Sequence, residues 1–127
     1  MIDCTIDSST LVDLARGWSP PEYLRTRFQN AGISHVVLGE MLLGAAKASS
    51  FRERQNVTRI LVGLTILHGD AQTAIIYARI RADLERQGLM IPQNDIWIAA
   101  ASVQAGLPLV AKDEHFRRIR GLKLIEY

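Results

Sequence analysis

The amino-acid sequence predicts an α/β protein in which helices cover both faces of a mostly parallel sheet of about five strands. Short apolar or β-branched runs alternate with longer helical segments along the whole chain, which is typical of parallel sheets. The 127 residues are 48% hydrophobic and 22% charged, and they contain no linker, repeat or biased tract. We therefore expect one three-layer α/β/α domain that spans Met1 to Tyr127.

The first strand is predicted at 2–6, where β-branched residues are frequent. A helix should follow from about Ser9 to Arg16, because its start has a capping-box pattern and Gly17 can end it. The next helix should begin near Pro20 and Pro21, which suit a first helical turn, and run to about Gln29.

The middle of the chain is predicted to contain two strands and three helices. A strand at 33–35 leads into a helix at 36–48 whose apolar residues share one face. Helices at 51–63 and 70–87 enclose a short strand at 65–68. Three further elements complete the chain: a helix at 92–104 and strands at 109–111 and 122–126.

Charge and cysteine content exclude several classes of protein. A net charge of +2 is too weak to indicate a nucleic-acid partner by itself. No apolar run approaches the ~18 residues of a membrane span, and the start of the chain does not have the pattern of an export signal. Cys4, the only cysteine, cannot form a disulfide within the chain. We expect a soluble protein of the reducing cytoplasm with no membrane partner.

Four carboxylates occupy positions that are unusual for acids. Asp7 directly follows the first strand, and Asp113 follows the strand at 109–111 after one intervening lysine. Asp95 lies in the first turn of a helix, and Glu40 has apolar or small residues three and four positions away on both sides. The carboxyl ends of parallel strands meet at one edge of a sheet, where ligands bind. We therefore expect these four side chains to converge there.

Each acid also has a simpler interpretation when it is taken alone. Asp7 and Asp95 can cap helices, and Asp113 can be a solvated loop residue. Glu40 is harder to explain in this way, because a carboxylate on an apolar helix face is costly without a partner. Carboxylates within ~5 Å of one another repel by about 3 kcal/mol per pair, so a cluster needs a cation or must retain protons.

A set of oxygen ligands selects Mg²⁺ or Mn²⁺ over Zn²⁺. The three histidines have no ligand spacing, and we expect His35, His68 and His115 to be structural or surface residues. The sequence contains no nucleophilic triad signature and no glycine-rich phosphate loop. Metal-assisted phosphoryl chemistry is the interpretation that these residues favour.

Four blocks of the sequence together resemble the PIN-domain ribonucleases, most closely the VapC-type toxins of toxin–antitoxin pairs. The resemblance covers essentially the whole chain and is carried by these blocks: Ile6 to Leu14, Gly39 to Gly44, Pro92 to Ala100 and Leu109 to Phe116. It implies that Asp7, Glu40, Asp95 and Asp113 bind Mg²⁺, or Mn²⁺ in its place, and that Ser9 supports a ligand or the bound water. The implied activity is endonucleolytic cleavage of RNA that leaves a 5′-phosphate and a 3′-hydroxyl.

The sequence departs from the family pattern at one position and varies at another. Ala111 stands where relatives commonly have Thr or Ser, which predicts the loss of a supporting hydrogen bond. Some relatives have Asn in place of the final acid, so we expect Asp113 to be the least essential of the four.

The resemblance also implies partners. VapC-type proteins are usually homodimers that are silenced by a VapB-like antitoxin, whose C-terminal segment wraps the toxin and can place a basic side chain in the acidic site. Met41, Leu42 and Trp97 are candidate partner contacts, although such side chains are more often part of a core. We also expect Lys112, Arg117 and Arg118 to hold RNA phosphates, with a solvated basic face as the simpler explanation.

Two other functions stay open at this point. The fold can serve as a catalytically silent RNA-binding or regulatory module, which the complete set of acids argues against. A small-molecule phosphatase on a similar sheet often has a second Asp two residues after the first, where this chain has Ser9.

Overall fold

The computed structural model describes all 127 residues, and its centre is a sheet of five parallel strands in the order β3-β2-β1-β4-β5. The strands are β1 (Cys4–Ile6), β2 (Ala31–Ser34), β3 (Thr65–Leu67), β4 (Leu109–Val110) and β5 (Leu124–Ile125). Thr5 pairs with Gly32 of β2 on one side and with Leu109 of β4 on the other. The chain therefore changes direction across the sheet at β1 and β4, and their carboxyl ends form the switch point where sites occur in such folds.

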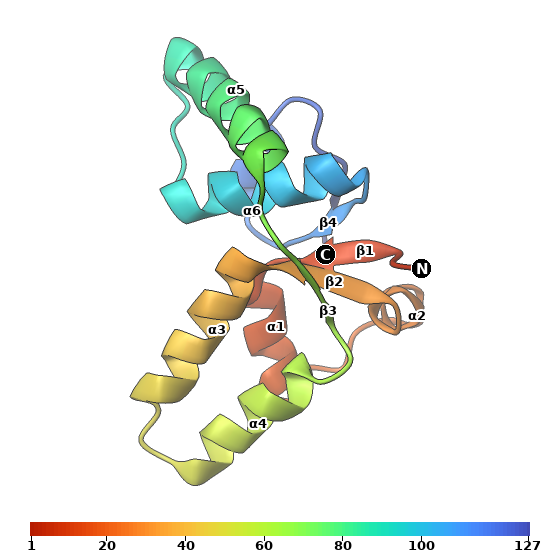
Figure 1. The fold of residues 1–127 in the computed structure, drawn as a ribbon. Helices are drawn as coiled ribbons and strands as arrows, with labels where there is room; N and C mark the ends of the chain where they lie inside the picture. Colours follow the sequence, from red (N-terminus) through yellow and green to blue (C-terminus); the bar gives the residue numbers. More distant parts are fainter.

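Six α-helices and one 3₁₀ helix surround the sheet (Figure 1). The helices are α1 (Ser8–Ala15), α2 (Glu22–Phe28), α3 (His35–Lys47), α4 (Phe51–Leu61), α5 (Ala71–Gln87), α6 (Gln93–Ala105) and η1 (Glu114–Arg118). Helices α1, α3 and α4 lie on one side of the sheet, and α5 and α6 lie on the other. The predicted three-layer α/β/α class with five strands is confirmed, and every strand pair is parallel.

Local sequence signals explain where the helices begin and end. The Ser34 hydroxyl accepts a hydrogen bond from the amide of Val37, and Asp70 forms a reciprocal capping box with Thr73 at the start of α5. Helix α5 ends at Gly88, whose φ of 67° lies in the left-handed region that glycine tolerates. Most predicted boundaries differ from the observed ones by one or two residues, and η1 is the one helix that was not predicted.

The core fixes the position of the switch point. β1 and β4 are buried along their whole length, and α6 buries Ile96, Ile98 and Ala99 against the sheet. Tight packing of this kind leaves little freedom for the residues that follow β1 and precede or begin α6. No helix in this structure combines the length and the apolar character that crossing a bilayer requires.

Candidate active site

Asp7 directly follows β1 and precedes α1, at the switch point of the sheet. Asp7 is only 3% exposed, and its side chain makes no capping hydrogen bond to α1, so helix capping does not explain the position of this acid. The Ser9 hydroxyl donates a hydrogen bond of 2.8 Å to Asp7 Oδ2, and its support of a bound metal stays a prediction. Burial raises the pKa of Asp7, and the charges of Glu40 and Asp113 raise it further.

Glu40 reaches the same place from α3. Its half-buried carboxylate accepts a hydrogen bond of 2.6 Å from the Ser8 hydroxyl. Ser8 and Ser9 thus hold two different carboxylates from adjacent positions in the first turn of α1. Sequence reasoning missed Ser8, and the only available signal was its position next to Asp7.

Asp95 lies in the first turn of α6, and His115 of η1 lies against it. His115 Nε2 is 2.7 Å from Asp95 Oδ2, and both side chains are largely buried. This short contact joins α6 to η1 beside the other acids. His115 is thus half-buried against Asp95, which is consistent with the expected structural role, and His35 and His68 are exposed.

The pKa of Asp95 is raised to about 6, first by burial and then by the negative charge of Asp7, with a smaller contribution from Glu40; the contact with His115 opposes this shift. A carboxyl with this pKa is close to its change of charge at neutral pH. The dipole of α6 favours the ionised form at this helix position, but the surrounding acids act in the opposite direction.

Asp113 is the fourth acid of the group. It lies between β4 and η1 in an exposed segment, and its charge acts on Asp7. The preceding Ala111 is fully buried, and its amide donates to the Ile125 carbonyl at 3.1 Å. Asp7, Glu40, Asp95 and Asp113 are here called the acidic cluster, because the charge of each of the other three acids interacts with that of Asp7; shared metal binding stays a prediction.

No lysine or arginine neutralises the acidic cluster. The structure contains no ion pair from either residue type to any of its four members. Lys112, which adjoins Asp113, turns away and places its Nζ 2.8 Å from Asp13 Oδ2. Uncompensated carboxylates are the donor set that hard divalent cations prefer. As they stand, no three of these side chains lie close enough together to hold one ion, so joint ligation requires side-chain rotation.

The basic residues that were predicted to contact RNA already have partners within the chain. Arg117 Nε donates to Glu126 Oε1 at 2.8 Å, and Arg118 Nη1 donates to the Met90 carbonyl at 3.1 Å. With Lys112 they form an exposed basic border beside Asp113. Their contact with RNA stays a prediction.

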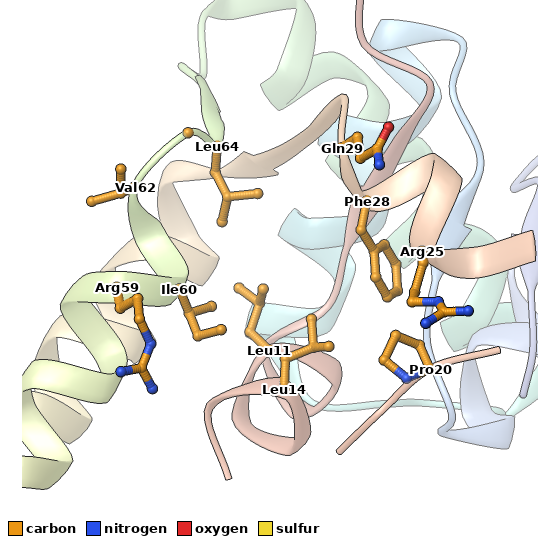
Figure 2. A pocket seen from close by; sticks show the side chains of 11 residues that line it. Leu11, Leu14, Pro20, Arg25, Phe28, Gln29, Arg59, Ile60, Val62 and Leu64 are labelled. Atoms are coloured by element: carbon orange, nitrogen blue, oxygen red, sulfur yellow. The ribbon is translucent and has the colours of Figure 1, made fainter. Parts of the chain in front are cut away.

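A second feature lies away from the acidic cluster, between α1, α2 and the end of α4. It is an open cavity of about 480 Å³, here called the apolar groove, into which Leu11, Leu14, Phe28, Ile60 and Leu64 point, with Arg25 and Arg59 at its sides (Figure 2). The sequence analysis did not predict this groove. Of the three side chains that it offered as partner contacts, Met41 is in the core, Leu42 is exposed, and Trp97 stacks on Tyr77.

Comparison with known proteins gives a consistent result. Residues 4–122 match the family described as PIN domain. Ribonuclease VapC2 of Haemophilus influenzae is 38% identical over 111 residues, which cover 82% of this chain and 83% of the relative. The tRNA(fMet)-specific endonuclease VapC of Salmonella typhimurium is 29% identical over 100% of this chain and 99% of its own length.

Two solved structures have the same fold over nearly the whole chain. VapBC2 of Rickettsia felis, bound to a DNA fragment from its promoter, superposes with a TM-score of 0.86, 26% identity and 97% coverage of both chains. DNA-bound VapBC of Salmonella typhimurium gives a TM-score of 0.84 with 29% identity, over 99% of this chain and 98% of the other.

Proposed function

This chain belongs to the PIN domain family and, within it, to the VapC ribonucleases; from that premise we propose that its acidic cluster binds Mg²⁺ and hydrolyses RNA, as the toxin of a toxin–antitoxin pair. Mn²⁺ is expected to substitute, since it accepts the same oxygen donors. RNA is favoured as the substrate because the relatives are named as ribonucleases and as a tRNA-specific endonuclease.

One observation carries the metal proposal. Asp7 is almost completely buried, is surrounded by three other acids, and has no cationic side chain to offset its charge. Such an arrangement is unfavourable unless it binds a cation or a proton. Burial is the largest cause of the raised pKa values of Asp7 and Asp95, and the neighbouring carboxylates raise both further.

The residues around the acidic cluster have distinct roles in this proposal. When bound, Mg²⁺ would lower the pKa of a water molecule and offset charge on the leaving oxygen. Ser9 orients Asp7, Ser8 orients Glu40, and His115 holds the carboxylate of Asp95 in place. Asp113 lies at the exposed side, where RNA approaches, and the basic border formed by Lys112, Arg117 and Arg118 would hold flanking phosphates.

The test uses purified protein that is free of antitoxin. We expect single-stranded RNA to be cut with Mg²⁺ or Mn²⁺, leaving 5′-phosphate ends, and the reaction to stop with EDTA. Asp7→Asn should remove the activity, whereas Asp3→Asn, at the opposite end of the same strand, should retain it. Cleavage that persists in EDTA would contradict the metal proposal. RNA binding without any cleavage would instead indicate the silent module.

The toxin assignment implies a protein partner, and we propose the apolar groove as its docking surface. The solved relatives are VapBC complexes, and the groove offers facing apolar side chains with an arginine on each side. An antitoxin segment with an apolar helix face and flanking acidic residues would match both features.

Homodimerisation and location are also proposals. Leu42 and Leu43 expose 51% and 59% of their surface on α3, and such apolar residues favour contact with a second copy. Sedimentation of Leu43→Asp beside the unchanged protein would test this contact.

We propose the cytoplasm as the compartment, because lone Cys4 is buried and burial raises its pKa to about 11, which leaves an inert thiol.

A further inference from the structure

A second cavity, of about 500 Å³, opens beside the acidic cluster between the first turns of α3, α5 and α6. Its lining includes His35, Val36, Asp70, Thr73, Asn94 and Trp97. Two of these residues fix its position relative to the acids. Asn94 directly precedes Asp95, and Val36 lies one helical turn before Glu40 on the same face of α3. The cavity therefore lies within about one helical turn of Glu40 and Asp95, although neither acid lines it.

The charge of this cavity excludes a phosphate as its ligand. No lysine or arginine lines it, and its one charged side chain is the carboxylate of Asp70. Hydrogen bonds from the Gln104 side chain and the Thr73 backbone lower the pKa of Asp70, so it is ionised at neutral pH. A neutral group with hydrogen-bond donors fits this surface better than an anion.

Two polar side chains of the cavity are free to bind a ligand, whereas Asp70 and Thr73 are hydrogen-bonded to each other and to Gln104. His35 and Asn94 are exposed, and neither has a side-chain hydrogen bond within the chain. The amide of Asn94 can donate and accept, and the His35 ring has one donor and one acceptor when neutral. Together with Asp70 they offer the mixed pattern that reads the edge of a base.

Trp97 supplies a rigid aromatic wall. Its ring stacks on Tyr77 with centroids 3.8 Å apart and planes at 11°, and the Tyr77 hydroxyl accepts a hydrogen bond of 2.9 Å from Arg81. A side chain that is already held in place loses little conformational entropy when a ligand stacks on it. Aromatic side chains are the usual platforms for unpaired bases.

We propose that this cavity, the base pocket, receives one unpaired nucleobase of the RNA next to the phosphate that is cut. The proposal rests on the nuclease function above and adds a determinant of sequence preference to it. A volume of about 500 Å³ lies within the range of small-molecule sites. Asp70 Oδ1 already accepts hydrogen bonds from Thr73 and Gln104, so Oδ2 is the oxygen that remains for the base. It favours guanine, which presents adjacent N–H and NH₂ donors, over uracil, which has a single donor.

Binding can be tested without catalysis. Trp18→Phe leaves Trp97 as the only tryptophan, and Asp7→Asn prevents cleavage of the probe. We expect single-stranded RNA tetramers that contain guanine to quench Trp97 fluorescence saturably, with oligo(U) binding more weakly and ribose 5-phosphate giving no quenching. Asn94→Ala should weaken binding about threefold to tenfold, the effect of one hydrogen bond. Gln93→Ala, an exposed neighbour outside the pocket, should not.

Cleavage provides the second measurement. His35→Ala and Asn94→Ala in the otherwise unchanged protein should raise KM and redistribute cuts away from guanine, with kcat at saturating RNA within about twofold. His68→Ala is the matched control, since His68 is exposed and lies outside this pocket. The base pocket is overturned if the parent cleaves RNA but no probe quenches Trp97, or if Asn94→Ala binds and cuts like the parent. Quenching with no cleavage by any variant would support the pocket and contradict the nuclease proposal.

Discussion

The acidic cluster and the apolar groove differ in the kind of partner that would stabilise each of them. The acidic cluster gathers four carboxylates with no lysine or arginine to offset them. The apolar groove gathers leucine, isoleucine and phenylalanine side chains around an open cavity between α1, α2 and α4. The first needs positive charge, and the second needs apolar surface.

This difference shows how one small domain can hold two functions apart. Electrostatic repulsion in the acidic cluster is relieved by a cation or by protons, whereas burial of apolar area in the groove is insensitive to both. Substitutions in one region should therefore leave the other function intact. The four predictions below test that separation.

The largest effect is expected for Asp95→Asn. RNA cleavage should fall by more than about 100-fold, above the 10–100-fold that the loss of a residue supporting a metal ligand costs. In EDTA the same variant should be more stable than the parent at pH 7.5. The native pKa of Asp95 is about 6, above its ordinary value of 3.8, so the contribution of this group to the parent's stability is full below pH 3.8 and is lost as pH rises through 6.

Thermal unfolding at pH 3.5 and pH 7.5 checks the stability of Asp95→Asn. The gain should be about 1 to 3 kcal/mol at pH 7.5, since one pKa unit corresponds to about 1.4 kcal/mol, and it should be smaller at pH 3.5. Asp113→Asn is the comparison, because Asp113 is exposed and should affect both properties less. A variant that is less stable at pH 7.5 would show that repulsion does not dominate in the acidic cluster.

The next effect concerns the apolar groove. Leu14→Asp should weaken antitoxin binding about 30-fold or more, the cost of losing a central contact worth about 2 kcal/mol, while RNA cleavage stays unchanged. Val62→Asp changes an exposed position of the same groove, so it should weaken antitoxin binding without disturbing the fold. Ile75→Asp on α5 is the control outside the groove. Titration calorimetry with the antitoxin gives the affinities; equal values for Leu14→Asp and Ile75→Asp would place the antitoxin elsewhere.

A smaller effect is expected for His115→Ala. The side chain positions Asp95, and its loss should lower Mn²⁺ affinity and cleavage by about 10-fold, within the range for residues that support metal ligands. Manganese binding measured by electron paramagnetic resonance reports the affinity independently of turnover. His68→Ala should match the parent, and a His115→Ala protein with unchanged manganese affinity would refute the positioning role.

The smallest effect belongs to the basic border. Lys112→Ala and Arg118→Ala should each raise KM about twofold to fivefold and reduce the salt dependence of RNA binding by about 0.7 in the log–log slope. Lys123→Ala is the control, because Lys123 precedes β5 and so lies at the amino ends of the strands, whereas the acidic cluster follows their carboxyl ends. Unchanged slopes would mean that these residues only solvate their own face, paired with Asp13 and the Met90 carbonyl.

Periodicity and strand-end positions made much of this protein predictable. The five strands, the six α-helices and the placement of Asp7 and Asp113 after β1 and β4 follow from local patterns and from the geometry of parallel sheets. Glu40 was expected near Asp7 because a carboxylate on an apolar helix face is costly alone, and the charges of Asp7 and Glu40 do act on Asp95. The short η1 helix has no periodic signal and was missed.

Tertiary structure alone decided which side chains touch. Ser8 and Glu40 lie 32 positions apart, and Asp95 meets His115 across the loop after β4. The apolar groove and the base pocket each need three separate helices to form. Local patterns report the free energy of forming one helix or strand, whereas these contacts depend on how the helices pack against the sheet, which is set by side chains distant in the chain.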